Sequence, residues 1–302
     1  MSRLAIRGEG ILRHHGTVLA VDRLDLRVPE GSVFGFLGPN GAGKTTTIRL
    51  LLGLLDPHGG DLEVLGRPMP AARGQILREV GALVEMPSLY PHLTGRENLE
   101  ITRRLKRCPA SAVARALEAV RLEDAADRPV RTYSLGMRQR LGLGLALLGD
   151  PKLLILDEPT NGLDPAGIRE VRELLRELPR RSGTTVFLSS HLLGEVELIA
   201  THLAVLDRGR LRFQGSLGDL QALHRPQLRI ETPERERARA ALTAEGILAE
   251  PQADGALLLP AESHAAAAAI NARLVGLGIP VHHLALVRPT LEGWFLDGKE
   301  AA

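Results

Sequence analysis

The sequence predicts an α/β fold with a mostly parallel core sheet, an antiparallel N-terminal part, a helical insertion and a small α/β module at the C-terminus. Two observations lead to this prediction. Short apolar runs that are typical of buried strands alternate with helical patterns, as in proteins built around a parallel sheet. Over residues 93–148 this alternation stops and helical patterns dominate, which indicates a helical insertion in the core.

The N-terminal part reads as strands and one helix. In "VLAVDRLDLRVPEG" (18–31) apolar residues recur mostly at every second position, which predicts antiparallel strands that end at Pro29–Gly31. "SVFGFL" (32–37) is apolar enough for a buried strand. Residues 44–55 have helical spacing, and the following Pro57 and glycines would end that helix.

Three helices are expected in the insertion, over 94–107, 111–122 and 136–149, within a helical subdomain of about residues 86–150. Thr94 with Glu97 three residues later is a capping-box pattern at the start of the first helix. The alternation then resumes with a strand at "KLLILDEP" (152–159), a helix over 166–178, a strand at "TTVFLSS" (184–190), another helix and strands within 203–215.

A break near residues 221–228 separates two expected domains, 1–222 and 223–302. The second domain would contain strand 227–231, helix 233–244, strand 256–259, helix 262–275, strand 280–287 and a short closing helix over 289–296. Because the chain shows no internal repeat, we expect one phosphate-binding core and not two.

The composition is that of an ordinary globular protein. The 302 residues are 44% hydrophobic and 25% charged, and the formal net charge of +2 gives no reason to expect nucleic acid as a partner. The single Cys108 excludes an intrachain disulfide and fits a reducing cytoplasm. The N-terminus lacks a signal-peptide core, and no apolar run approaches the roughly 18–20 residues that span a bilayer. We therefore expect the chain to reach a membrane only through a partner.

"GPNGAGKT" (38–45) fits the P-loop pattern Gly-x4-Gly-Lys-Thr, between a predicted strand and a predicted helix. Glycines let the backbone N–H groups of such a loop converge on phosphate oxygens at the positive end of the helix. Lys44 would reach the outer phosphates, Thr45 would bind Mg²⁺, and Thr46 would add a phosphate contact. The candidate phosphate-binding residues are Gly38, Pro39, Asn40, Gly41, Ala42, Gly43, Lys44, Thr45 and Thr46.

A second candidate site element is "KLLILDEPT" (152–160), where four apolar residues precede two carboxylates. Asp157 can bind Mg²⁺ through the water shell of the ion. Glu158 follows directly and can polarise an attacking water.

Together with these two motifs, three further segments resemble the ATP-binding-cassette (ABC) ATPases. "YSLGMRQRLGLGLALLGDPKLLILDEPTNGLDP" (133–165) resembles the signature motif, Walker B strand and D-loop of that family. "SSH" (189–191) resembles its switch histidine, and "VEMPSLYPHLTGRENL" (84–99) resembles its Q-loop region. The five segments occur in the order and spacing of the family and cover residues 1–220.

The resemblance implies a role for each matching residue, with ATP and Mg²⁺ as cofactors. Ser134 and Gly136 would bind the γ-phosphate held by the P-loop of an opposite subunit, and Asp164 would touch that subunit. Glu158 would be the general base, and His191 would contact the γ-phosphate and the attacking water. His15 stands where the family usually has an aromatic residue that stacks on adenine.

Two departures from the family pattern stand out. The signature reads Ser134-Leu135-Gly136-Met137, with one glycine where the family usually has two. Glu85 occupies the Q-loop position where most members have Gln, so the resemblance makes it a candidate nucleotide- and Mg²⁺-binding residue, and its carboxylate would add negative charge near the ion. Segment 83–99 with this Glu resembles the branch of bacitracin-resistance and lantibiotic-immunity exporters.

The resemblance implies the ATPase subunit of an exporter of drugs, antibiotics or peptides. Two copies would sandwich two nucleotides head to tail. A separate membrane permease would dock near residues 85–100, so that the chain sits peripherally at the cytoplasmic face of the cell membrane. The alternative is a soluble ABC ATPase of DNA repair or the ribosome, but the sequence has neither the long coiled coils nor the second cassette of those proteins. A P-loop kinase would leave the signature motif unexplained. The sequence does not identify a transported substrate.

Overall fold

The computed structural model describes residues 3–85, 87–223, 226–252, 254–261 and 263–287. The chain divides into two compact units, Met1–Leu217 and Gly218–Lys299, which we call the ATP-binding unit and the C-terminal module. The division falls at the start of helix α8 (Leu217–Leu223), a few residues before the expected boundary after residue 222. The closing helix predicted over 289–296 lies outside the described residues.

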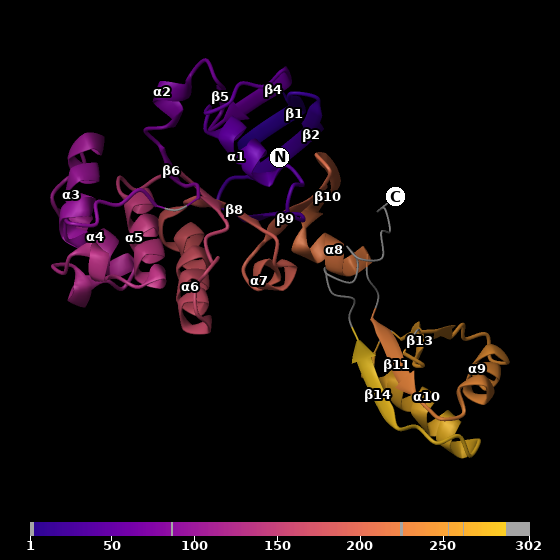
Figure 1. The fold of residues 1–302 in the computed structure, drawn as a ribbon. Helices are drawn as coiled ribbons and strands as arrows, with labels where there is room; N and C mark the ends of the chain where they lie inside the picture. Colours follow the sequence, from indigo (N-terminus) through magenta and orange to yellow (C-terminus); the bar gives the residue numbers. More distant parts are fainter. Residues whose placement is uncertain (1–2, 86, 224–225, 253, 262, 288–302) are drawn as a thin grey trace. The chain divides into compact units, whose positions relative to one another are not determined.

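Four strands from the N-terminal part of the ATP-binding unit form an antiparallel sheet of order β2-β1-β4-β5 (Figure 1). Along β2, Leu24, Leu26 and Val28 are buried and alternate with exposed residues, as the two-residue periodicity predicts. The strand bounds are β1 Leu4–His15, β2 Val18–Pro29, β4 Gly59–Val64 and β5 Arg67–Pro68.

The central sheet has the order β10-β9-β3-β8-β7-β6, and its strands are parallel except for the antiparallel pair β9–β10. Every residue of β3, β7 and β8 is buried, as expected for a sheet covered on both faces. The strand bounds are β3 Val33–Leu37, β6 Val80–Leu83, β7 Leu153–Asp157, β8 Thr185–Ser190, β9 His202–Asp207 and β10 Arg210–Ser216. The carboxyl ends of these parallel strands meet at one edge, so the segments after β3, β7 and β8 lie close together.

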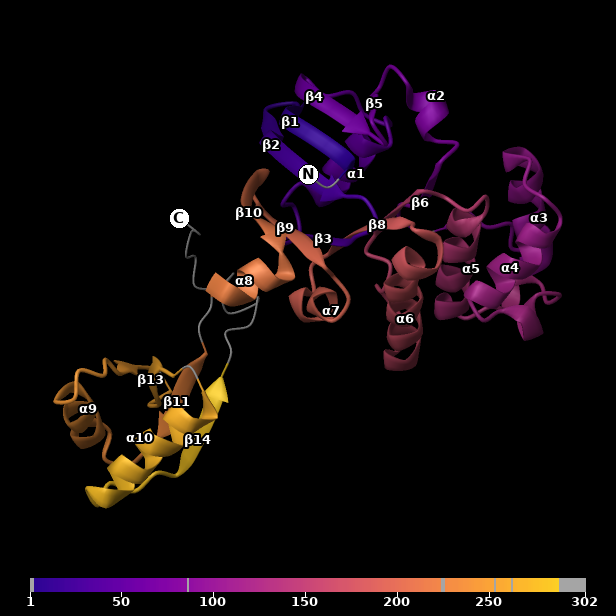
Figure 2. The same cartoon turned by 180° about the vertical axis from the view of Figure 1, so that it is seen from behind.

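Helices α3, α4 and α5 pack together beside the β6 end of the central sheet and form the predicted helical subdomain (Figures 1 and 2). The capping box is confirmed, because Thr94 Oγ1 accepts from Glu97 N and Glu97 Oε2 accepts from Thr94 N. Helix α1 ends earlier than predicted, because Gly53 turns the chain with a φ of +61°. The helix bounds are α1 Lys44–Leu51, α2 Arg73–Ile76, α3 Gly95–Lys106, α4 Ser111–Ala119, α5 Leu135–Leu147, α6 Pro165–Ser182 and α7 Leu193–Glu197, with short 3₁₀ turns at Glu123–Ala125 and Val130–Thr132.

The C-terminal module follows the order β-α-β-β-α-β, with an antiparallel sheet of order β12-β13-β11-β14. Its core contains Leu228, Ile230, Leu257 and Leu259 from the two central strands. The two-residue strand β12 was not predicted, and the last strand begins at His283 and not at residue 280. The bounds are β11 Gln227–Glu231, α9 Arg235–Thr243, β12 Glu250–Pro251, β13 Leu257–Pro260, α10 His264–Gly276 and β14 His283–Val287.

Candidate nucleotide-binding site

The P-loop joins β3 to α1 at the carboxyl edge of the central sheet. Gly41 and Gly43 have φ values of +80° and +106°, which side chains disfavour. A Cβ on Gly43 would lie 2.4 Å from the carbonyl oxygen of Ala20, so no larger residue fits there. Gly209, in the turn between β9 and β10, donates from its backbone N to Ala42 O in the loop over 2.9 Å. The glycines therefore let the loop pack closely against its neighbours.

Lys44 is buried at the first position of α1, with 6% of its surface exposed. Its Nζ donates to Gly38 O over 2.7 Å and to Pro39 O over 3.3 Å, across the loop that it follows. It also lies 3.4 Å from Glu158 Oε1. The ammonium is thus held at the centre of the loop by carbonyl oxygens and one carboxylate, where phosphate oxygens could become its partners.

Asp157 and Thr45 meet beside the loop. Thr45 Oγ1 donates to Asp157 Oδ2 over 2.9 Å, and Ser189 Oγ donates to Asp157 Oδ1 over 2.5 Å. Asp157 ends β7 and is paired in register with Ser189 on the parallel strand β8. The sheet therefore fixes the carboxylate from one side, and the hydroxyl of Thr45 approaches it from the other.

These oxygen atoms suit Mg²⁺, which takes one or two protein ligands and completes its shell with phosphate oxygens and water. Thr45 and Asp157 supply a hydroxyl and a carboxylate within hydrogen-bonding distance of each other. The described residues contain no group of three or more His, Cys, Asp or Glu side chains that could hold a metal ion. The donor set fits a magnesium ion that arrives with a nucleotide.

Glu158 and His191 form a pair at the same edge. His191 Nδ1 lies 2.8 Å from Glu158 Oε2, and the side chains are 38% and 22% exposed. Glu158 has a φ of +49°, and its backbone N donates to Ser189 Oγ. A non-glycine residue in the left-handed region carries strain that its surroundings must offset. Here the strained backbone directs the carboxylate toward His191 and Lys44, where water has access.

His15 lies at the end of β1, and its Nε2 is 3.4 Å from Thr46 Oγ1 in the first turn of α1. Its ring is exposed. The structure therefore brings the residue predicted to stack on the base next to the loop predicted to bind the phosphates.

Ser134, Gly136 and Asp164 form a separate group at the starts of α5 and α6. Ser134 Oγ accepts from Met137 N over 3.2 Å, and Asp164 Oδ1 accepts from Gly167 N over 2.9 Å, so both residues are N-caps. A Cβ on Gly136 would lie 3.4 Å from Leu163, which places the two helix starts side by side. Within the part of the chain that the structure describes, no hydrogen bond or ion pair joins this group to the P-loop.

Glu85 has a φ of +62°, and its Oε1 accepts from Arg49 Nη2 over 2.5 Å. The carboxylate, 63% exposed, is thus paired with the last turn of α1. No interaction between described residues joins it to Thr45 or Asp157.

Two side chains at the site were missed by the sequence analysis. Ser189 bridges Asp157 and the backbone of Glu158, and buried Gln139 on α5 donates to Pro159 O over 3.2 Å. The serine had a usable signal, since it is a polar residue near the carboxyl end of an apolar strand. Gln139 had a weaker one, as a polar residue on the buried face of its helix.

Comparisons with known proteins show the family of the chain. The family model described as ABC transporter matches residues 21–161. The bacitracin transport ATP-binding protein BcrA of Bacillus licheniformis is 41% identical over 234 residues, which cover 77% of this chain and 76% of that protein. The chain belongs to the ABC transporter family.

Two other relatives of this ABC protein cover less of its length. The uncharacterized ABC transporter ATP-binding protein YhcH of Bacillus subtilis is 50% identical over 192 residues, 63% of each chain. The Nod factor export ATP-binding protein I of Ralstonia nicotianae is 41% identical over 216 residues, 70% of this chain and 67% of that protein.

Solved structures show the same cassette fold and confirm the predicted fold class. An ATP-binding subunit of an ABC transporter matches with a TM-score of 0.66 and 27% identity, over 73% of this chain and 93% of that one. The dimeric cassette MJ0796 bound to ADP and Pi matches with a TM-score of 0.64 and 23% identity, over 70% of this chain and 98% of that one. The chain is an ABC-type ATPase and the ATP-binding subunit of an ABC transporter.

Proposed function

We propose that this ATPase drives an exporter of drugs, antibiotics or peptides through a separate membrane permease. The observation that carries the proposal is the 41% identity to the bacitracin transport protein BcrA over most of this chain. The Nod factor export protein adds a second relative that acts in export. Among the described residues, no helix is long and apolar enough to cross a bilayer. In this proposal a separate permease supplies the membrane spans.

The working unit in this proposal is a head-to-tail dimer with two nucleotides between the copies. The P-loop group and the Ser134 group share no bond within one described chain, so a second copy would complete each site. The first backbone N–H groups of α5, which follow the N-cap Ser134, have no partner within the helix. They suit the γ-phosphate of the nucleotide on the opposite copy. His15 would stack on the adenine, and Asp164 would touch the opposite copy.

Hydrolysis in this dimer is mostly positioning and electrostatics. Lys44 would exchange its carbonyl partners for the phosphates, and Thr45 and Asp157 would hold Mg²⁺, which would neutralise part of the phosphate charge. Glu158, oriented by His191 and by Ser189, accepts a proton from the water whose oxygen attacks the γ-phosphorus. The bond to the bridging oxygen breaks, ADP keeps that oxygen, and phosphate leaves. Loss of the γ-phosphate removes the contacts that hold the copies together.

The permease would dock near residues 85–100, and the chain would lie peripherally at the cytoplasmic face of the membrane. The test is to co-express the chain with a candidate permease, prepare inside-out vesicles and measure ATP-dependent uptake of bacitracin or lantibiotic peptides. We expect transport with the natural chain and none with Glu158→Gln. A chain that hydrolyses ATP but co-purifies with no membrane protein, and stimulates no transport, would contradict the proposal.

A further inference from the structure

We propose that Asp22 is a positioning residue for the P-loop, on which it acts through the turn between β9 and β10 without contacting nucleotide. Asp22 lies on β2, outside the motifs that predict the nucleotide site. Its side chain is only 6% exposed, so the fold buries a carboxylate near a loop that is expected to bind an anion. The inference rests on the proposed binding of phosphate by the P-loop and is independent of export.

A β-bulge in β2 directs Asp22 toward this turn. The register of β2 against β1 shifts between Val21 and Leu24, where β2 has one residue more than β1. Within this bulge Arg23 has a φ of +49°, and the neighbours Val21 and Asp22 are both buried. Bulges often redirect a side chain next to a functional site. Here the bulge lets the backbone of Asp22 bond outside the β1–β2 pair.

Asp22 holds the turn at two points. Its backbone N donates to Gly209 O over 2.9 Å, and its Oδ2 accepts from Arg210 Nε over 2.7 Å. Arg23 Nε donates to its Oδ1 over 3.3 Å, so two guanidinium groups offset the charge of the carboxylate. Arg208 and Gly209 form the turn and have φ values of +48° and +80°, as a tight two-residue hairpin requires. The buried carboxylate thus fixes the turn against β2, which lies beside β10 (Figures 1 and 2).

The turn in its own position orients one peptide of the P-loop. Gly209 N donates to Ala42 O, and the N–H and C=O of a planar trans peptide point to opposite sides. The N–H of Gly43 therefore points away from the turn. Gly43 is the N-cap of α1, where N–H groups without helical partners suit phosphate oxygens. A Cβ on Gly209 would lie 2.9 Å from Ala20 O, so the turn is already in close contact with β2.

Asp22 should therefore affect phosphate binding without touching phosphate. If the turn shifts, the Ala42–Gly43 peptide is free to rotate, and a carbonyl oxygen in place of the N–H would repel the phosphate. The energy at stake is at most that of one hydrogen bond to a charged group, so we expect nucleotide affinity to fall about 5–50-fold without Asp22. The loss should appear in binding and not in the hydrolysis step, because the peptide would contact ground state and transition state alike.

The experiment measures the Kd of Mg-ADP by titration calorimetry on the full chain. Asp22→Asn keeps the shape of the side chain but removes its charge, and should raise the Kd about 5–50-fold. Arg210→Gln should act in the same direction, and because Arg210 is 62% exposed, this second variant serves if Asp22→Asn does not fold. The double variant should bind no worse than the weaker single one, since both changes break the same bond. In hydrolysis, KM for ATP should rise while kcat stays the same.

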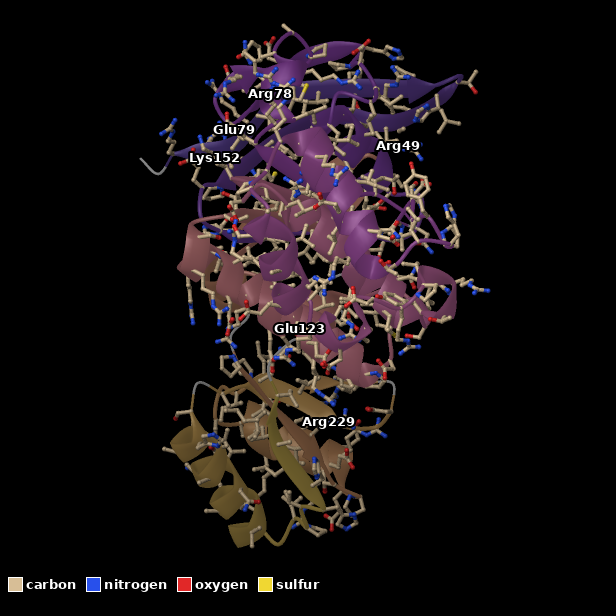
Figure 3. The ribbon with its side chains drawn as sticks, turned by 90° about the vertical axis from the view of Figure 1, so that its left-hand side faces the viewer. Arg49, Arg78, Glu79, Glu123, Lys152 and Arg229 are labelled. Carbon is tan, nitrogen blue, oxygen red and sulfur yellow. The ribbon has the colours of Figure 1, made fainter. Side chains whose placement is uncertain are left out.

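Glu79→Gln is the matched control. Glu79 also binds two cations, Arg67 and Lys152, but at the amino ends of β6 and β7, the opposite edge of the central sheet from the P-loop. In Figure 3, Glu79 and Lys152 lie together on the left of the ATP-binding unit, and Arg49 of α1 lies on the right. Loss of this carboxylate should cost stability much as Asp22→Asn does, but should leave the Kd of Mg-ADP unchanged.

Hydrogen exchange tests the intermediate step. The amide of Gly209, which is bonded to Ala42 O, should exchange faster in Asp22→Asn and in Arg210→Gln than in the natural chain. Glu79→Gln should leave its exchange unchanged. Mass spectrometry of a peptide that spans the turn between β9 and β10 measures this. Equal protection in all variants would show that Asp22 does not hold the turn and would overturn the inference.

Lys44→Ala separates this inference from the proposed phosphate site. If Lys44→Ala binds Mg-ADP as tightly as the natural chain, the proposed site fails, and the exchange of the Gly209 amide still decides whether Asp22 holds the turn. If Lys44→Ala loses binding while Asp22→Asn and Arg210→Gln leave the Kd unchanged, the positioning role is refuted. A Kd that Glu79→Gln raises as much as Asp22→Asn would refute it as well.

Discussion

The ATP-binding unit and the C-terminal module differ in what their interiors contain. The module has an apolar core built from Leu, Ile and Ala. All buried polar side chains among the described residues lie in the ATP-binding unit: Asp22, Ser32, Lys44, Thr47, Asn98, Gln139, Asp157, Thr184, Thr185, Ser189 and Ser190. Within the described ranges, the non-glycine residues with positive φ, Glu85 and Glu158 among them, lie in that unit as well.

The two interiors differ in how much they cost in folding stability. A buried polar group costs free energy unless it has partners, and a left-handed non-glycine residue costs more. Lys44, Asp157 and Ser189 have such partners: Lys44 donates to the P-loop backbone, and Asp157 accepts from the hydroxyls of Ser189 and Thr45. The ATP-binding unit therefore carries such costs at its candidate site and elsewhere, while the described part of the module is built around an apolar core.

The largest effect is expected for Glu158→Gln. The amide cannot accept the proton of the attacking water, so ATP hydrolysis should fall by about 10²–10⁴-fold. Nucleotide binding should persist, because the P-loop is unchanged. Steady-state hydrolysis and equilibrium binding of a labelled ATP measure the two quantities, and substantial hydrolysis by the variant would remove Glu158 from its proposed role.

Ser189→Ala tests the buried polar group that orients both carboxylates. Without the hydroxyl, Asp157 Oδ1 and the backbone N of Glu158 each lose their partner. We expect Mg²⁺ affinity in the presence of nucleotide to weaken by about 10–100-fold, the usual cost when a group that holds a metal ligand is lost. A magnesium titration of the hydrolysis rate checks this, with Ser182→Ala as the control, since Ser182 is exposed at the end of α6.

Leu257→Ala tests the apolar core of the module. Loss of this fully buried side chain should reduce the unfolding free energy of the module by about 2–5 kcal/mol. ATP affinity should not change if the two units have independent cores. Calorimetry with and without nucleotide would show this as a lower transition for the module alone. A single transition that shifts for the whole chain would argue against independent cores.

The smallest expected effect is on folding stability at low pH. A hydrogen bond from Arg210 lowers the pKa of Asp22 below its ordinary value of 3.8, and in the module the backbone N–H of Ala256 and then Arg229 lower the pKa of Asp254. A carboxyl with a lowered folded pKa stabilises the fold above its unfolded pKa, and this contribution is lost as the pH falls through the folded value.

Each unit should therefore lose some stability below about pH 4. Arg210→Gln should flatten that loss in the ATP-binding unit only, and Arg229→Gln should flatten it in the module only. The difference is measured by urea unfolding of each variant at several pH values, monitored with one probe in each unit. An unchanged pH dependence in both variants would show that these pairs contribute nothing.

Much of the ATP-binding unit could be predicted because its local patterns are strong. The P-loop, the apolar run before Asp157 and the capping box at Thr94 each depend on neighbouring residues in the sequence. The cassette fold and the ABC family were predicted from such segments and are confirmed. The short strands β4, β5, β6 and β12 were missed; β5 and β12 have two residues each, which carry no periodicity that could separate a strand from a loop.

What could not be predicted are contacts between distant segments. The Ser189–Asp157 bond depends on the register of two parallel strands, and the Arg49–Glu85 pair joins residues on different elements. Gln139 bonds to a carbonyl twenty positions along the chain. No local pattern encodes these distances, since they follow from the packing of the whole unit. The roles of all the site residues, among them Lys44, Asp157, Glu158, Ser134, Gly136, Asp164 and His191, remain predictions.

The most direct test of the account mixes two inactive variants. Lys44→Ala disables the P-loop, and Gly136→Asp places a negative charge where the γ-phosphate of the opposite copy would bind. If nucleotide is held between two copies, a mixed dimer keeps one site with an intact P-loop and an intact signature, so the mixture should hydrolyse ATP faster than either variant alone. A mixture no more active than the sum of its two components would contradict the account.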